Sequence, residues 1–299
     1  MSSSQLANGL SIWQWYKSAI KQAKIANVSL SELDWLIREI TGIDSLALRL
    51  DSYKNLSNVP LKLSLLELDE LWHQRLDNSL PVQYIVQSTP WRDLILKVTP
   101  AVLIPRPETE LLIDLLENLE KEQSFLNQGV WVDLGTGSGA IAIAVARLFV
   151  KAKVYAVDLS DEALKVAREN VTQYNLGENI QIVQGSWWDS LSFLTNSVTG
   201  MISNPPYIPT TLIEELDANV KNHEPHLALD GGIDGLQAIR TLINTSPRYL
   251  ISGGIWLIEI MIGQADTVAK LLQENGNYQE VELLKDLSGI DRFVLARRI

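Results

Sequence analysis

The 299-residue sequence contains no cysteine and only three histidines, which narrows the chemistry that it can carry. Without cysteine there are no disulfides, no thiol catalysis and no cysteine metal sites, and we predict no metal site of any kind. No apolar run approaches membrane-spanning length, and no basic region followed by an apolar core stands near the first residue. We therefore expect a cytoplasmic protein without a membrane partner.

Positive charge is also scarce, since the formal net charge is −11. Residues 1–90 carry a net charge of −1, and the remainder carries −10. This imbalance weighs against duplex nucleic acid as the main partner, although it does not exclude a local basic groove. An apolar fraction of 46% with 20% charged residues is typical of a globular protein with a sizeable core.

The most informative stretch is Asn204-Pro205-Pro206-Tyr207. Two consecutive prolines lack backbone N–H groups and push Asn204 toward an extended conformation, so the stretch cannot be a helix or a central strand. It follows the apolar run Val198 to Ile202, which reads as a buried strand. We therefore predict a rigid loop at the carboxyl end of a strand, where open α/β sheets bind ligands.

Such a loop offers two acceptors beside an aromatic face. The side-chain carbonyl of Asn204 and the main-chain carbonyl of Pro205 can receive both hydrogens of a planar –NH2 group, with Tyr207 lying against its plane. The nitrogen lone pair then points at an incoming electrophile. Taken alone, an Asn-Pro-Pro-Tyr sequence is also typical of an ordinary turn, so the rest of the chain has to decide.

Strand and helix patterns alternate from residue 129 onward. This order predicts an α/β fold, in which a mostly parallel sheet carries helices on both faces. The last two strands have no helix between them, which predicts an antiparallel edge. The expected strands are 130–134, 154–157, 180–183, 198–202, 255–260, 278–284 and 292–296, and the expected helices are 140–148, 162–174, 232–243 and 264–274.

Residues 1–80 read as a small helical bundle that docks another protein. Apolar residues recur at helical spacing in three segments, and capping boxes are expected at Ser29 with Glu32 and at Ser64 with Glu67. The tryptophans of this part are interpreted as packing residues.

Residues 81–105 are predicted to form a β-hairpin linker, because 82–87 and 94–98 favour strands. The domain that carries the chemistry would then span 106–299. The segment Arg106 to Glu110 reads equally as a loop that joins the domains or as a lid over a site. Thr109 is expected to cap a helix that starts at Glu110. Glu259 is expected to end a strand at the same edge of the sheet as the site. It reads either as a structural carboxylate or as a residue that helps to close the pocket, and we do not favour it as a base.

A glycine-rich loop, Asp133-Leu-Gly-Thr-Gly-Ser-Gly139, joins the first expected strand of the sheet to its helix. Its glycines allow close approach of a ligand to the backbone, and Asp158 closes the next strand, where it can accept hydrogen bonds from ribose hydroxyls. An adenosine-type ligand is predicted. The loop also satisfies the dinucleotide-binding pattern. Hydride transfer, however, usually needs a proton-transferring residue, and none stands out in the sequence. Methyl transfer from a sulfonium needs no such residue.

The glycine loop, Asp158 and the Asn-Pro-Pro-Tyr loop together resemble the class I S-adenosylmethionine-dependent methyltransferases that modify –NH2 nitrogens. Five further motifs make the resemblance more specific: Pro81-Val-Gln-Tyr-Ile, Leu103-Ile-Pro-Arg-Pro-Glu-Thr-Glu110, Gln184-Gly-Ser-Trp187, Glu224-Pro225 and Asp230-Gly-Gly-Ile-Asp-Gly235. Together with the N-terminal bundle, these motifs resemble the HemK-type (PrmC) release-factor glutamine methyltransferases.

The resemblance implies a Rossmann-like seven-stranded domain that uses S-adenosyl-L-methionine. Its implied reaction is methylation of the side-chain amide nitrogen of the glutamine in the Gly-Gly-Gln motif of bacterial peptide chain release factors, its partner proteins. The implied catalytic residues are Asn204, Pro205 and Tyr207, and these with Pro206 would bind the substrate. The implied cofactor-binding residues are Gly135, Thr136, Gly137, Ser138 and Gly139 beside the methionine portion, Asp158 at the ribose, Trp187 beside the adenine, and Asn204.

Gln87 departs from the family pattern, which usually has glycine there. Two other functions remain open. A nucleic-acid adenine N6-methyltransferase uses a very similar loop, but the acidic balance weighs against it. A scaffold that binds the cofactor without catalysis would keep the glycine loop, but would have no need of Asn204 and Tyr207.

Overall fold

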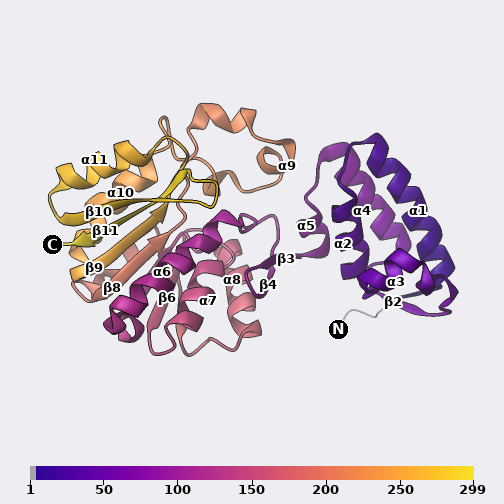
Figure 1. Cartoon of the computed structure of the whole chain (residues 1–299), viewed down its shortest axis with the longest axis horizontal. Helices are drawn as coiled ribbons and strands as arrows, with labels where there is room; N and C mark the ends of the chain where they lie inside the picture. Colours follow the sequence, from indigo (N-terminus) through magenta and orange to yellow (C-terminus); the bar gives the residue numbers. More distant parts are fainter. Residues whose placement is uncertain (1–4) are drawn as a thin grey trace. The chain divides into compact units, whose positions relative to one another are not determined.

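The computed structural model describes residues 5–299, and the side chains of all of these but residues 122 and 124. Residues 1–4, with the serines at the start of the chain, lie outside it. The chain divides into two compact units (Figure 1). The helical unit comprises Met1–Gln87 with Asp217–His223, and the α/β unit comprises Ser88–Leu216 with Glu224–Ile299. No helix among residues 5–299 combines the length and the apolar character needed to cross a bilayer.

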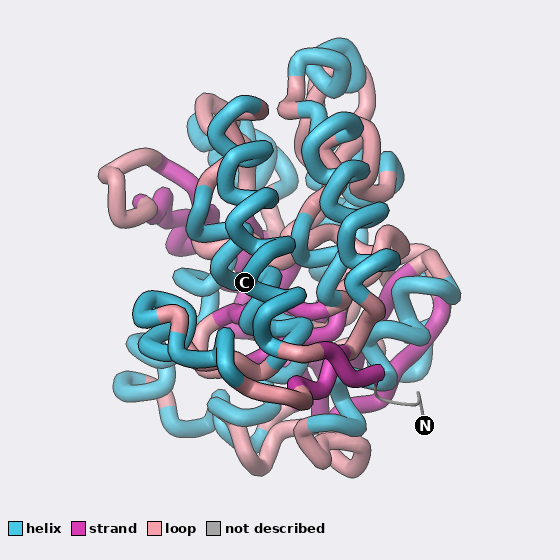
Figure 2. The backbone as a smooth tube through the Cα atoms, turned by 90° about the vertical axis from the view of Figure 1, so that its right-hand side faces the viewer, coloured by secondary structure: helices cyan, strands magenta, loops and turns pink. Residues whose placement is uncertain are grey.

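The helical unit consists of short helices with one small two-stranded sheet (Figure 2). Its core includes Ile12, Leu36 and Trp72, none of which is exposed. The three helices expected from the sequence are confirmed. The elements are β1 (Gln5–Ala7), α1 (Gly9–Ile25), α2 (Leu30–Thr41), α3 (Ser45–Leu50), β2 (Val59–Leu61), α4 (Leu65–Asn78), α5 (Val82–Val86) and α9 (Ala218–Lys221), with one 3-10 turn, Ser52–Asn55.

One of the two expected capping boxes forms. The Ser64 hydroxyl accepts from the backbone N–H of Glu67, and the Glu67 carboxylate accepts from the backbone N–H of Ser64, which closes the box at the start of α4. The box predicted at the start of α2 is wrong. There the Ser29 hydroxyl accepts from the N–H of Ser31 at 3.3 Å, so it caps the helix without a reciprocal contact from Glu32.

The strand predicted over residues 82–87 is also wrong, because this stretch is the helix α5. Burial overrides its β-prone composition: Ile85 and Val86 pack into the core of the helical unit. Gln87 ends the helix in the left-handed conformation, with φ of 55°. This is a backbone position that favours glycine, which the family usually has there. The hairpin lies further along, between β3 (Ser88–Trp91) and β4 (Leu94–Lys97).

The α/β unit is built on a seven-stranded sheet of order β10-β11-β9-β8-β5-β6-β7. The four pairings from β9 through β8, β5 and β6 to β7 are parallel. At the other edge, β11 pairs antiparallel with β9, and β10 pairs antiparallel with β11. The predicted sheet with its antiparallel edge is therefore confirmed. The strands are β5 (Val130–Leu134), β6 (Lys153–Asp158), β7 (Ile180–Gln184), β8 (Val198–Ser203), β9 (Leu250–Glu259), β10 (Tyr278–Lys285) and β11 (Asp291–Arg298).

Helices cover both faces of this sheet, as Figure 1 shows. One core layer packs α6, α7 and α8 against the sheet, and the other packs α10 and α11. Two predicted starts differ from the structure by five residues, and the other predicted boundaries differ by at most two. The helix expected from 232 starts at 237, because Gly232 and Gly235 adopt positive φ in a turn, and the strand expected from 255 starts at 250. The helices are α6 (Leu111–Glu122), α7 (Ala140–Leu148), α8 (Asp161–Gln173), α10 (Gln237–Thr245) and α11 (Ala265–Asn275).

Gly200, in the middle of β8, makes room for a tryptophan of the neighbouring strand. It pairs with Trp131, which has no exposed surface, and a Cβ added at Gly200 would lie 2.3 Å from the Trp131 ring. We expect Gly200→Ala to lower the free energy of unfolding by about 1–3 kcal/mol, because a packed core cannot accept the extra carbon without moving. Thermal unfolding followed by circular dichroism measures this loss.

Gly177→Ala is the matched control for that substitution. Gly177 is exposed, its φ is not positive, and no atom lies within 4 Å of the added Cβ. We expect its melting temperature to match that of the unmodified protein or to rise slightly. Equal melting temperatures for both variants would show that Trp131 does not constrain β8.

Candidate active site

The candidate site lies where the order of the parallel strands reverses. The chain runs from β5 through β6 to β7 on one side, and then returns to β8 and β9 on the other side of β5. The loops that follow β5 and β8 therefore face each other at the carboxyl edge of the sheet, where ligands of such folds bind. A cavity of about 350 Å³ opens there. Its size and mixed lining suit a small organic ligand.

The loop after β5 is shaped by glycine. Gly135, Gly137 and Gly139 all have positive φ, with values of 79°, 54° and 84°. A Cβ added at Gly137 would meet no atom within 4 Å, so the bare backbone faces open space there. The loop is tied to β6, because the N–H groups of Gly135 and Thr136 both donate to the carbonyl of Val157 at 2.9 Å. It then leads directly into α7.

Asp133 anchors this loop from beneath. Its side chain is fully buried, and one carboxylate oxygen accepts from the Thr136 hydroxyl at 2.6 Å and from the Ala142 N–H at 3.0 Å. Burial raises the pKa of Asp133 to about 7, although these two hydrogen bonds lower it. The residue ties the glycine loop to the first turn of α7 and does not line the cavity.

Asp158, the last residue of β6, presents its carboxylate to the same cavity. One oxygen accepts from the Gly137 N–H and the other from the Ser160 N–H, both at 2.9 Å. Burial raises the pKa of Asp158, and these backbone hydrogen bonds oppose the rise. Each oxygen retains capacity for a further donor, so the carboxylate can still receive hydroxyl groups of a ligand.

The cavity brings together most of the residues that the sequence singled out. Its lining includes Gly135, Thr136, Gly137, Ser138, Asp158, Trp187, Asn204 and Pro206. Gly139, Pro205 and Tyr207 are not part of the lining: Gly139 is the N-cap residue that precedes α7, Pro205 is buried, and Tyr207 is only partly exposed. The loop before α6 contributes a wall that includes Val102, Leu103 and Pro105.

Asn204 and Tyr207 are held by one buried carboxylate. The Asn204 side-chain N–H donates to the Thr109 hydroxyl at 3.1 Å, and that hydroxyl donates to Glu259 at 2.6 Å. The Tyr207 hydroxyl donates to the other Glu259 oxygen at 2.9 Å. The prediction that Thr109 caps a helix is therefore wrong: α6 has no side-chain cap, because the Thr109 hydroxyl faces Glu259 instead. Glu259 ends β9, as expected.

Arg106 also makes a structural contact. Its guanidinium nitrogen Nη2 lies 2.7 and 2.8 Å from the two oxygens of Glu224, whose side chain is 1% exposed. Burial raises the pKa of Glu224, and the charge of Arg106 lowers it. The Trp91 indole N–H donates to the carbonyl of Arg106 at 2.9 Å, which fixes the backbone next to Pro105, a residue of the cavity lining.

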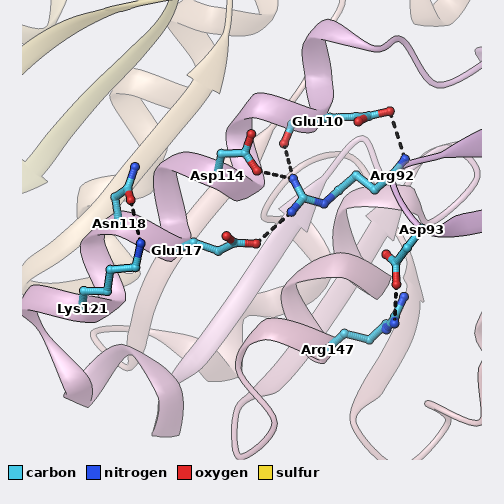
Figure 3. Close-up of polar contacts among 8 residues, drawn as sticks. All are labelled: Arg92, Asp93, Glu110, Asp114, Glu117, Asn118, Lys121 and Arg147. Atoms are coloured by element: carbon cyan, nitrogen blue, oxygen red, sulfur yellow. Dashed lines mark hydrogen bonds and ion pairs between the residues drawn. The ribbon is translucent and has the colours of Figure 1, made fainter.

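The start of α6 is held by Arg92 at the turn of the β3–β4 hairpin (Figure 3). The Arg92 guanidinium donates to Asp114, to Glu117 at 2.8 Å and to the carbonyl of Glu110 at 3.1 Å. The Arg92 N–H also donates to the Glu110 carboxylate at 2.9 Å. These contacts fix the segment that carries Thr109 and therefore the support beneath Asn204.

Known proteins are similar to this chain in sequence and in fold. The family model described as methyltransferase small domain matches residues 108–223. The release factor glutamine methyltransferase of Synechocystis sp. is 47% identical over 287 residues, which cover 96% of this chain and 96% of that protein. The protein of the same name from Caulobacter vibrioides is 36% identical over 284 residues, covering 95% of this chain and 94% of its own. The chain belongs to the release factor glutamine methyltransferase family.

Solved structures agree with this methyltransferase fold. The hMettl16 catalytic domain, solved in complex with MAT2A 3′UTR hairpin 1, matches with a TM-score of 0.54 at 16% identity. The match covers 81% of this chain and 83% of that chain. At such low identity the likeness concerns the fold alone. The chain is thus an S-adenosylmethionine-dependent methyltransferase by family and fold.

The cavity of this methyltransferase fits S-adenosylmethionine, the cofactor that its family uses. The lining contains bare glycine backbone and, hydrogen-bonded to it, the Asp158 carboxylate. The Trp187 ring is close to the glycine loop, since a Cβ added at Gly135 would lie 3.7 Å from it. Trp187 itself adopts positive φ, 52°, which turns the chain after β7 toward the cavity.

Sequence reasoning missed the role of Thr109 and the contacts of Glu259 in this methyltransferase. The two residues are 150 positions apart, and neither belongs to a local pattern that announces the contact. The one available signal was position: Glu259 was expected at the end of a strand on the edge that also carries the Asn-Pro-Pro-Tyr loop. Asp133 was noticed only as the start of the glycine motif.

Proposed function

We propose that this methyltransferase transfers a methyl group from S-adenosyl-L-methionine to the N5 side-chain amide nitrogen of a glutamine. The substrate glutamine is that of the Gly-Gly-Gln motif of bacterial peptide chain release factors, and the reaction takes place in the cytoplasm. The observation that carries the proposal is the placement of Asn204 on the wall of the cavity that the glycine loop and Asp158 also line. The names of the relatives, which match this chain over nearly their full length, support the choice of substrate.

Cofactor binding is assigned to four features of the cavity. The backbone from Gly135 to Gly139 is proposed to hold the methionine portion, and Asp158 to accept hydrogen bonds from the ribose hydroxyls. Trp187 is proposed to lie beside the adenine, and Asn204 to stand between the cofactor and the substrate. When bound, S-adenosyl-L-methionine supplies an electrophilic methyl group on a sulfonium.

The residues of the site are proposed to act by orienting the substrate amide. An amide nitrogen is a poor nucleophile, because its lone pair is delocalised into the carbonyl. The side-chain oxygen of Asn204 and the main-chain carbonyl of Pro205 are proposed to accept the two amide hydrogens, so that the nitrogen faces the methyl group. Pro206 is proposed to stiffen the loop that carries these two acceptors, and Tyr207 is proposed to lie against the plane of the substrate amide. Orientation of this kind supplies on the order of 7–11 kcal/mol.

No early base is needed, because the nitrogen becomes acidic only as the new N–C bond forms and the S–C bond breaks. The proton is then lost to water. Glu259 is not suited to remove it, since both of its oxygens already accept hydrogen bonds and its side chain is buried. Burial raises the pKa of Tyr207 far above the physiological range, so its phenol is not a base either.

We propose that the helical unit docks the release factor. Residues 1–80, as expected from the sequence, would form this docking domain, 81–105 a linker and 106–299 the catalytic domain. Support comes from apolar side chains that the helical unit leaves largely exposed, including Leu46, Leu50 and Leu66. No residue of the proposed chemistry lies in this unit.

The test is transfer of labelled methyl from S-adenosyl-L-methionine to purified, unmethylated release factor, with DNA and RNA in parallel reactions. We expect label on the release factor alone. Label on nucleic acid alone would favour an adenine N6-methyltransferase. Cofactor binding without transfer to any of the three would favour a scaffold that catalyses nothing.

A further inference from the structure

The hydrogen bonds beneath Asn204 run in one direction, and that direction fixes which end of its amide faces the cavity. A carboxylate can only accept, so the Thr109 hydroxyl must donate its single hydrogen to Glu259. The Thr109 oxygen then offers only lone pairs to Asn204. The contact of 3.1 Å between them therefore requires the N–H end of the Asn204 amide. No other side chain or backbone group that the structure describes in residues 5–299 donates a hydrogen bond to the oxygen of that amide.

The support is rigid, because it lies in the core beneath the cavity wall. Thr109 is 4% exposed and Glu259 2% exposed. The second Glu259 oxygen accepts from the Tyr207 hydroxyl, so the carboxylate cannot turn without losing that bond. Thr109 itself is held in the short 3-10 turn Glu108–Glu110 that Arg92 ties to the hairpin.

We propose that Thr109, held by Glu259, is a positioning residue that keeps the Asn204 amide oxygen turned toward the substrate nitrogen. This inference rests on the proposed function. An amide has two ends of nearly equal size, and the reversed Asn204 would place N–H against the N–H of the substrate amide. Such a pairing repels, so only one of the two orientations is productive. Thr109 touches no substrate atom in this role.

Thr109→Val tests the proposal, because valine keeps the shape of the side chain and removes its hydroxyl. We expect kcat to fall about tenfold, as for the loss of one orienting hydrogen bond, while the dissociation constant for S-adenosyl-L-methionine changes less than threefold. Thr109→Ser, which keeps the hydroxyl, should restore most of kcat. An unchanged kcat in Thr109→Val, or a kcat in Thr109→Ser as low as that of valine, would overturn the proposal.

Thr199→Val is the matched control for loss of a buried threonine hydroxyl. Thr199 is 4% exposed, and its hydroxyl accepts from the Val130 N–H at 3.1 Å, outside the cavity lining. It should lower the melting temperature without lowering kcat. If both valine variants lose kcat equally, the effect is general destabilisation and the positioning role is wrong.

A second readout does not depend on the identity of the substrate. The side-chain NH2 signal of Asn204 in a ¹⁵N–¹H correlation spectrum is assigned by its loss in Asn204→Ala. We expect one of its hydrogens to exchange slowly with water, and this protection to disappear in Thr109→Val and persist in Thr109→Ser. Equal exchange in all three proteins would refute the proposal. Absence of methyl transfer by the unmodified enzyme would instead count against the proposed function alone.

Discussion

Asn204→Ala is expected to lower kcat by about 10²- to 10³-fold, while the dissociation constant for S-adenosyl-L-methionine changes little. The substitution removes one of the two acceptors that orient the substrate amide, and positioned groups of this kind contribute about that much to rate. The cofactor keeps the glycine loop and the Asp158 carboxylate, which stand on other strands. Single-turnover kinetics and calorimetric titration separate the two quantities.

Asn118→Ala is the control for this substitution. Asn118 lies on the outer side of α6 and accepts a hydrogen bond from the exposed Lys121 (Figure 3), so its removal should leave kcat unchanged. Equal losses of kcat and of cofactor affinity in Asn204→Ala would contradict the assignment. They would show that Asn204 supports the cofactor pocket rather than the reacting amide.

Asp158→Ala is expected to have the opposite pattern, with cofactor affinity about 100-fold weaker and a much smaller loss of kcat at saturating cofactor. A 100-fold loss of affinity corresponds to about 2.7 kcal/mol of binding free energy. This is the loss expected when the hydrogen bonds between a carboxylate and two ribose hydroxyls disappear. The variant also removes the acceptor for the Gly137 N–H, which loosens the loop. Fluorescence or calorimetric titration with S-adenosyl-L-methionine measures the affinity.

Asp158→Asn separates the two contributions. Asparagine keeps an oxygen for the Gly137 N–H but has no charge and only one acceptor, so we expect a loss of about tenfold. If Asp158→Asn binds as weakly as Asp158→Ala, the charge and both oxygens are required. Unchanged affinity in both variants would remove Asp158 from the cofactor site.

The α/β unit was predictable because its signals are local. Strand β5 and helix α7 have the predicted bounds, since a glycine loop separates an apolar run from a run of helix formers. The stretch 82–87 was not predictable in this way. Three of its six residues are β-branched, which favours a strand, and only its packing in the core of the helical unit decides that it is a helix.

The residues of the candidate site likewise fall into those that a local sequence pattern predicts and those that it does not. Asn204, Asp158 and the glycine loop each carry a short pattern, so their meeting at the carboxyl edge followed from the order of the strands. The support beneath Asn204 joins the ends of two elements that are far apart in the chain. A buried threonine and a buried glutamate have many structural uses, and only three-dimensional contact shows which one applies here.

The loop after β8 is proposed to hold a glutamine amide of a release factor. Mass spectrometry of a release factor after reaction with S-adenosyl-L-methionine, beside a version with Gln→Ala in its Gly-Gly-Gln motif, tests this proposal. We expect one added methyl group, located by fragmentation on the side-chain amide of that glutamine, and none on the alanine version. A methyl group on any other residue, or equal labelling of both versions, would contradict it.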